Sequence, residues 1–155
     1  MSPFELYRTA GKLAPPSMVA AQEYAERAAE CAASVTHRLS ARPDLERLIG
    51  PDNQAMMEDN HRNHARFMES IFLHYDPATL VETVLWVYRA YLAHGFQLTY
   101  WPAQLNTWVD VLREHLSPEA FTEIYPFYHW FLIHQADFVR LAGSTHLPEP
   151  PHEFT

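Results

Sequence analysis

Apolar residues recur every three or four positions along most of the chain, which is the spacing of a buried helical face. The pattern is clearest between positions 17 and 42, where its apolar positions are Ala20, Tyr24, Ala28, Cys31, Val35 and Leu39. A second long segment, 53–74, carries on one side Met57, His61, His64, Met68, Ile71 and Phe72. We therefore expect two long helices that each turn one face toward a core.

Proline and glycine separate the remaining periodic segments. No run of Val, Ile and Thr alternates with polar residues between Asn-Gly or Asp-Gly turns, so strands are not expected. Asp76-Pro77 is typical of a helix start and Gly95 of a helix end. The predicted helices cover 17–42, 44–49, 53–74, 78–94, 100–116 and 119–141, with a kink at Pro126. This predicts an all-α domain of six to seven helices over residues 1–143, followed by an extended, proline-rich tail, 144–155.

The charge balance excludes several classes of protein. The 155 residues contain 11 Lys and Arg against 19 Asp and Glu, a net charge of −8. Binding to nucleic acid or to an anionic membrane needs the opposite sign. No apolar run approaches the roughly 20 residues of a membrane span, and the acidic start does not resemble a secretory signal. With a single cysteine, Cys31, there is no disulfide framework and no cysteine-based zinc site. We expect a cytoplasmic protein.

Ten histidines are the main candidates for chemistry. Glu58 and His61 form one Glu-x-x-His pair, but a di-iron site needs a second pair, which the sequence lacks. His61 and His64 share a helical face and could serve a cofactor. The alternative is an exposed polar helix, because their neighbours are Asp59, Asn60, Arg62 and Asn63.

Nucleophilic catalysis has little support in the sequence. Gly-x-Ser-x-Gly, a glycine-rich phosphate loop and His-Glu-x-x-His are all missing. Cys31 is interpreted as a core thiol and Ser117 as a helix cap. No catalytic residue is therefore assigned, and we do not expect an enzyme.

Aromatic residues crowd the C-terminal half of the chain. Such a set builds either a well-packed core or the wall of a pocket for a flat apolar ligand. Its members are Trp86, Tyr88, Tyr91, Phe96, Tyr100, Trp101, Trp108, Phe121, Tyr125, Phe127, Tyr128, Trp130, Phe131 and Phe138.

The run YLAHGFQLTYWP at 91–102, followed by Leu105, Trp108 and Leu112, resembles the junction between the F and G helices of the globin family. Bacterial globins and globin-coupled sensors have a similar pattern of glycine, aromatics and proline there. The segment 38–50 is similar to the globin B–C corner, and 121–138 would correspond to the H helix. The resemblance implies a globin-like, all-α bundle.

The resemblance also implies a set of site residues. Tyr91 stands where the family has its proximal histidine, Ile49 where a phenylalanine contacts haem, and Val35 at the distal position of the B helix. The distal position of the E helix falls at His61 or His64. The implied pocket residues are His61, His64, Met68, Val87, Tyr91, His94, Phe96, Trp101 and Leu105.

Two functions follow from this resemblance. The first is a signalling sensor or ligand-binding domain that holds a small apolar or gaseous ligand and lacks a standard haem site. The second is a haem protein for dioxygen, nitric oxide or peroxide. Its iron would be bound by His64, His61 or His94, or by Tyr91 as a phenolate. The cofactor is therefore none or haem, and the resemblance allows a homodimer through the last two helices.

Overall fold

The computed structural model describes residues 3–143, and all the regular structure in this range is helical. Eight helices follow one another along these residues. They are α1 (Pro3–Ala10), α2 (Met18–Ser40), α3 (Leu45–Ile49), α4 (Gln54–Leu73), α5 (Pro77–Ala93), α6 (Tyr100–His115), α7 (Pro118–Ile133) and α8 (Gln135–Ala142). The prediction of an all-α fold is confirmed.

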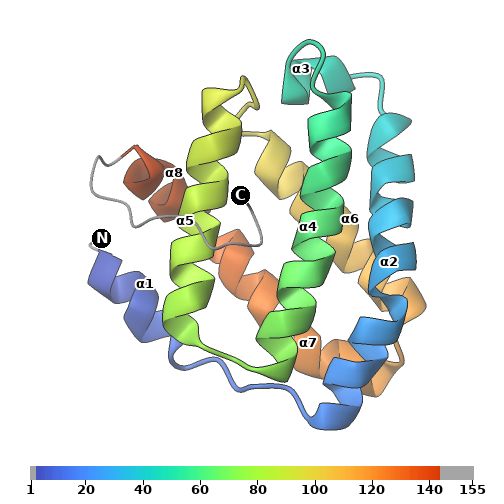
Figure 1. The fold of residues 1–155 in the computed structure, drawn as a ribbon, viewed down its shortest axis with the longest axis vertical. Coiled ribbons are helices and arrows are strands. Elements are labelled where there is room, and N and C mark those ends of the chain that lie inside the picture. The colour runs from blue at the N-terminus through green and yellow to red at the C-terminus, as the bar shows by residue number, and fades with distance from the viewer. Residues whose placement is uncertain (1–2, 144–155) are drawn as a thin grey trace.

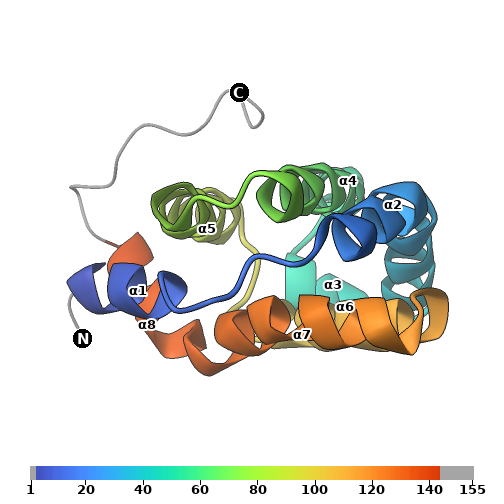
Figure 2. The same ribbon diagram turned by 90° about the horizontal axis from the view of Figure 1, so that it is seen from below.

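The helices form two layers. Helices α2, α4 and α5 lie side by side in one layer, and α6, α7 and α8 run beneath them (Figures 1 and 2). Helix α1 packs against α5 at the end of the upper layer. The core between the layers is rich in aromatic residues, and its largest fully buried side chains include Trp101, Trp108, Tyr24 and Tyr100. No helix within residues 3–143 is long and apolar enough to cross a membrane.

The long helix α2 follows its sequence pattern closely. All six of the apolar positions expected on its inner face, from Ala20 to Leu39, are buried. The Cys31 thiol is among them, and burial raises its pKa to about 12, which keeps it protonated and unreactive. The interpretation of Cys31 as a core residue is confirmed.

Reciprocal hydrogen bonds join the N-termini of α2 and α7. Ser17 caps α2 and donates its N–H to Glu123 at 2.7 Å, while Ser117 caps α7 and donates its N–H to Glu23 at 2.5 Å. Each serine hydroxyl also donates to the same glutamate. Because each glutamate binds the other helix, this arrangement fixes two distant segments to one another. The expected cap at Ser117 is confirmed.

Two glycine turns meet at the opposite end of the upper layer. Gly50 and Gly95 have φ angles of 82° and 98°, which favour glycine. A Cβ on Gly50 would lie 3.1 Å from the Gly95 carbonyl oxygen. The Asn53 side chain donates to the carbonyls of both Ile49 and His94 at 2.7 Å. The corner between α3 and α4 is therefore bonded to the end of α5.

The predicted number of helices was too small. Helix α1, of eight residues, was not among the predicted helices. The expected single helix 119–141 is divided at His134 into α7 and α8, and Pro126, where a kink was expected, lies inside α7. The tail predicted at 144–155 lies outside the described residues.

Candidate functional site

Helices α4 and α5 are neighbours that do not pack closely. The closely packed helix pairs within residues 3–143 are α2–α4, α2–α6, α5–α8, α2–α7, α6–α7, α1–α5 and α7–α8. Helix α4 is thus anchored on α2, and α5 on α1 and α8. The space between α4 and α5 is bridged by side chains, and we call this region the α4–α5 seam.

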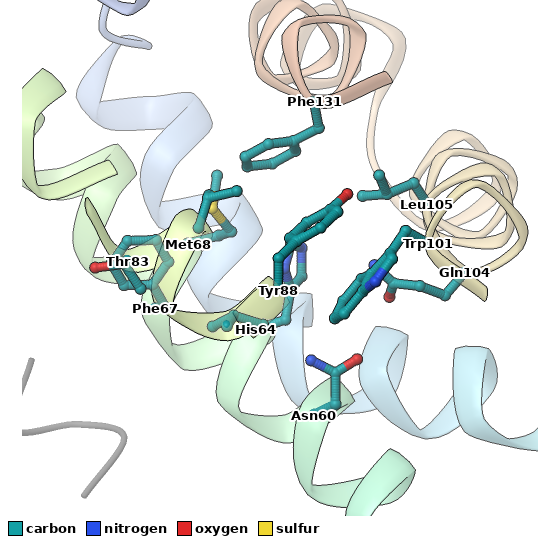
Figure 3. A pocket seen from close by; sticks show the side chains of 12 residues that line it. Asn60, His64, Phe67, Met68, Thr83, Tyr88, Trp101, Gln104, Leu105 and Phe131 are labelled. Carbon is teal, nitrogen blue, oxygen red and sulfur yellow. The ribbon is translucent and has the colours of Figure 1, made fainter. Parts of the chain in front are cut away.

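A cavity of about 50 Å³ lies in the seam (Figure 3). Helix α4 lines it on one side, α5 on the other, and α6 and α7 close its floor. The lining residues are Asn60, His64, Phe67, Met68, Thr83, Val84, Val87, Tyr88, Trp101, Gln104, Leu105 and Phe131. No side chain in this set carries a formal charge at neutral pH when His64 is neutral.

Two aromatic rings form one wall of the cavity. Tyr88 of α5 and Trp101 of α6 stack with their ring centroids 4.2 Å apart and an angle of 18° between the planes. Tyr91, one turn after Tyr88, packs edge-on against the same Trp101. The stacked pair joins α5 to α6, and it fills space in which a flat ligand would otherwise lie.

His64 is neutral at physiological pH. Its Nε2 is 2.8 Å from the Tyr128 hydroxyl, and its ring centroid lies 4.7 Å from that of Trp108. Loss of hydration lowers the pKa of His64 to about 3, with a further contribution from nearby His61. The imidazole therefore offers hydrogen bonds to the cavity region rather than a positive charge.

Several polar atoms of the lining are buried without a hydrogen-bond partner in the part of the chain that the structure describes. They include Trp101 Nε1, Gln104 Oε1 and Thr83 Oγ1. The three residues are only 2%, 3% and 1% exposed. A buried polar group that lacks a partner costs roughly 1–3 kcal/mol, so most proteins avoid it. Their concentration at one cavity marks the α4–α5 seam as the candidate site.

The structure brings together part of the expected site. His64, Met68, Val87, Trp101 and Leu105 all line the cavity. The other four expected residues do not line it.

His61 instead belongs to a buried hydrogen-bond chain behind the cavity. Its Nδ1 lies 2.7 Å from the Thr36 hydroxyl on α2 and its Nε2 lies 3.1 Å from the Tyr100 hydroxyl on α6. Tyr100 donates its proton to Asn60 Oδ1 at 2.7 Å, so it accepts from His61, and Thr36 donates to Nδ1. The alternative of an exposed polar helix holds for Asp59 and Arg62 but not for Asn60 and His61, which are both buried.

Tyr91, Phe96 and His94 have structural contacts at the end of α5. The Tyr91 and Phe96 rings pack edge-on, with centroids 4.9 Å apart. His94 is exposed, and its Nδ1 lies 2.8 Å from the Ala90 carbonyl oxygen. Val35 and Ile49 are buried, but neither lines the cavity.

Polar residues of the lining were missed by sequence reasoning. Asn60, Thr83 and Gln104 had no motif to mark them. Gln104 follows Trp101 by three positions, and a glutamine on the apolar face of a predicted helix is the signal that could have found it. Phe67 of the lining was also not expected there.

The residues of the seam do not fit a haem group as they are arranged. Pockets for drug-sized ligands have volumes of roughly 300–1,000 Å³, and haem needs a pocket of at least this size. The cavity of the seam has a volume of only about 50 Å³. His61 has both ring nitrogens bonded to protein groups, and His94 is outside the seam. Burial, with Asp59 nearby, raises the pKa of Tyr91 to about 12, which disfavours a phenolate ligand. Within residues 3–143, no three His, Cys, Asp or Glu residues are grouped as a metal site.

Comparison with family models, with curated proteins and with solved structures finds no match to this chain. The resemblance to globins therefore stays a hypothesis that rests on the sequence.

Proposed function

We propose that this chain is a globin-like sensor domain that binds a small ligand in the cavity between α4 and α5 without a standard haem site. The observation that carries the proposal is the group of unpaired, buried polar atoms at a cavity between two helices that do not pack closely. A domain selected only for stability would pair or remove such atoms.

The arrangement of helices supports the globin-like part of the proposal. Eight helices occur in residues 3–143, in two crossing layers, and globins also pack eight helices around their ligand pocket. The seam lies between the helices that the sequence resemblance equates with the globin E and F helices. The haem alternative has no comparable support, because the cavity is too small for the group.

The seam also offers a way for binding to produce a signal. Helix α5 is anchored on α1 and α8, whereas α4 is anchored on α2. A ligand that touches both α4 and α5 connects two parts of the domain that otherwise have separate supports. It would favour whichever spacing of the two helices suits it best, which is a population shift.

Xenon under pressure tests whether the cavity accepts a ligand. The methyl resonance of Met68, which lines the cavity, should shift with xenon, whereas that of exposed Met18 should not. In a Val84→Phe variant, whose larger side chain fills the cavity, the Met68 shift should disappear. A Met68 resonance that is insensitive to xenon, or equally sensitive in Val84→Phe, would contradict the proposal.

Hydrogen exchange tests the sensor part. Xenon bound in the seam should slow amide exchange in α4 and α5. Exchange in the first turns of α2 should not change, because the hydrogen bonds of Ser17 and Ser117 already hold those turns. Slowing that is uniform over the domain would indicate general stabilisation rather than a response of the seam.

A further inference from the structure

We infer that the cavity of the seam selects small uncharged molecules that carry both a hydrogen-bond donor and an acceptor, of which primary amides are the simplest class. This inference rests on the proposed function, since it names the chemistry of the ligand for the same site. It is carried by the pair Trp101 and Gln104 and by the absence of charge in the lining.

Trp101 and Gln104 present complementary groups from one helix. They are three positions apart on α6 and therefore on the same face. The indole N–H of Trp101 can only donate, and Gln104 Oε1 can only accept. Neither atom has a hydrogen-bond partner within residues 3–143. In Figure 3 both side chains extend from α6 toward the cavity. One ligand that accepts from Trp101 and donates to Gln104 would satisfy both.

The other polar residues of the lining do not compete for this role. Asn60 Oδ1 already accepts from Tyr100 at 2.7 Å, and His64 Nε2 is 2.8 Å from the Tyr128 hydroxyl. The Thr83 hydroxyl lies at the opposite side of the cavity from Gln104 in Figure 3. The Tyr88 hydroxyl of the lining is also unpaired within residues 3–143, but it belongs to α5. The pair on α6 is therefore the place in the lining where an unpaired donor and an unpaired acceptor share one helix face.

The lining favours a neutral ligand. It contains no Asp, Glu, Lys or Arg, and its other walls are Phe67, Met68, Val84, Val87, Leu105 and Phe131. A charged ligand would lose its hydration without gaining an opposite charge, which is strongly unfavourable. The volume of about 50 Å³ admits only a few non-hydrogen atoms, since one water needs roughly 10–15 Å³ by this measure.

Four molecules of nearly identical shape separate these requirements. Acetamide is neutral, donates and accepts; acetate is charged; acetone only accepts; and isobutene does neither. Binding is followed by the methyl resonance of Met68, which lines the cavity and is present in every variant. Hydrogen bonding to the ligand is followed by the indole N–H resonance of Trp101, identified by its loss in Trp101→Phe. We expect acetamide to bind roughly tenfold more tightly than acetone, acetate not to bind in the same range, and isobutene to bind without a hydrogen-bond shift at Trp101.

Variants assign the effect to the pair. Gln104→Leu should weaken acetamide roughly tenfold and leave isobutene as tight or tighter, whereas Gln22→Leu, the same change at an exposed position of α2, should alter neither. Trp101→Phe keeps an aromatic ring and removes the donor, so it should weaken acetamide and acetone together.

The outcomes distinguish the ligand class from the proposed function. Acetate that binds as well as acetamide, acetone or isobutene that binds more tightly, or acetamide binding that is unchanged in Gln104→Leu would overturn the class. In those cases the cavity still binds a ligand, and water forms the hydrogen bonds to its polar atoms. If none of the four molecules binds and xenon leaves Met68 unshifted, the ligand site itself is wrong and both proposals fail.

Discussion

Helix α4 has two neighbours in its layer, and it meets them in opposite ways. Toward α2 it packs closely, and small buried residues on both helices, Ala28, Ala32 and Ala65, allow the backbones to approach. On the outside this pair leaves a groove lined by Ala25, Ala29 and Ala33 among others. Toward α5 the contact is made by large side chains, and a cavity remains.

The two sides also differ in how they treat buried polar atoms. On the α2 side, His61 has both ring nitrogens bonded, to Thr36 and Tyr100. At the seam, Trp101 and Gln104 each have a buried polar atom that finds no partner among residues 3–143. Because an unpaired buried group costs stability, the polar atoms on the α2 side stabilise the fold, whereas those at the seam are the basis of the proposed ligand site. The predictions below test this difference.

The largest expected effect is a loss of stability in acid. Burial holds the pKa of both His61 and His64 at about 3, while unfolding returns each to about 6.5. The stability is therefore fully present above pH 6.5 and is lost as the pH falls from 6.5 toward 3, by roughly 1 kcal/mol per pH unit for each histidine. Urea unfolding at about pH 7 and about pH 5 measures this.

Variants of two histidines on the α2 side show where the acid sensitivity lies. His61→Gln should reduce the dependence on pH by about half, because one of the two imidazoles with a lowered pKa is gone. His37→Gln changes an exposed histidine on α2 and should leave the dependence nearly as it is. An equal slope in all three proteins would show that His61 does not control the acid response.

The same substitution at two valines should have different effects on stability on the α2 side of α4 and at the seam. Val35 on α2 is fully buried away from the cavity, so Val35→Leu overpacks the core and should cost about 2 kcal/mol. Val84 lines the cavity, so Val84→Leu has room and should be neutral or stabilising by up to about 1 kcal/mol. Thermal and urea unfolding of both variants gives the comparison. Equal losses at the two sites would mean that the seam is packed as tightly as the rest of the core.

Removing one unpaired polar atom from the seam should stabilise the unliganded domain. Thr83→Val replaces the buried hydroxyl by a methyl group of similar size and should raise the free energy of unfolding by about 1 kcal/mol. The matched change on the other side, Thr36→Val, removes the donor to His61 and should lower it by a similar amount. A loss of stability in both variants would indicate that Thr83 has a role that its surroundings do not show.

The smallest expected effect concerns the bonds between α2 and α7. Glu23→Gln replaces one carboxylate oxygen that accepts from Ser117 and should cost about 0.5–1 kcal/mol. Glu26→Gln, at an exposed position on the same helix, is the control and should cost less. Because these bonds lie away from the seam, binding of acetamide should be the same in both variants. Weaker binding in Glu23→Gln alone would show that the two regions are coupled.

The sequence by itself determined the features that depend on neighbours along the chain. The buried face of α2, the cap at Ser117, the start of α5 at Pro77 and its end before Gly95 follow from helical spacing and from the conformational limits of proline and glycine. The expectation that Met68, Val87 and Leu105 line one cavity came from the resemblance to globins. The resemblance indicated which helices face one another, which helical spacing alone does not.

Only the tertiary structure decided which face of each helix meets which partner. His61 and His64 are three positions apart, yet one bonds to α2 and α6 while the other lines the cavity. Gln104 became a site residue because its partner atoms are missing, a property that no local pattern records. Periodicity fixes the direction in which a side chain points from its helix. The cost of burying its polar atoms depends on groups that lie tens of residues away, such as Thr36 and Tyr100 for His61, and these meet only in the folded chain.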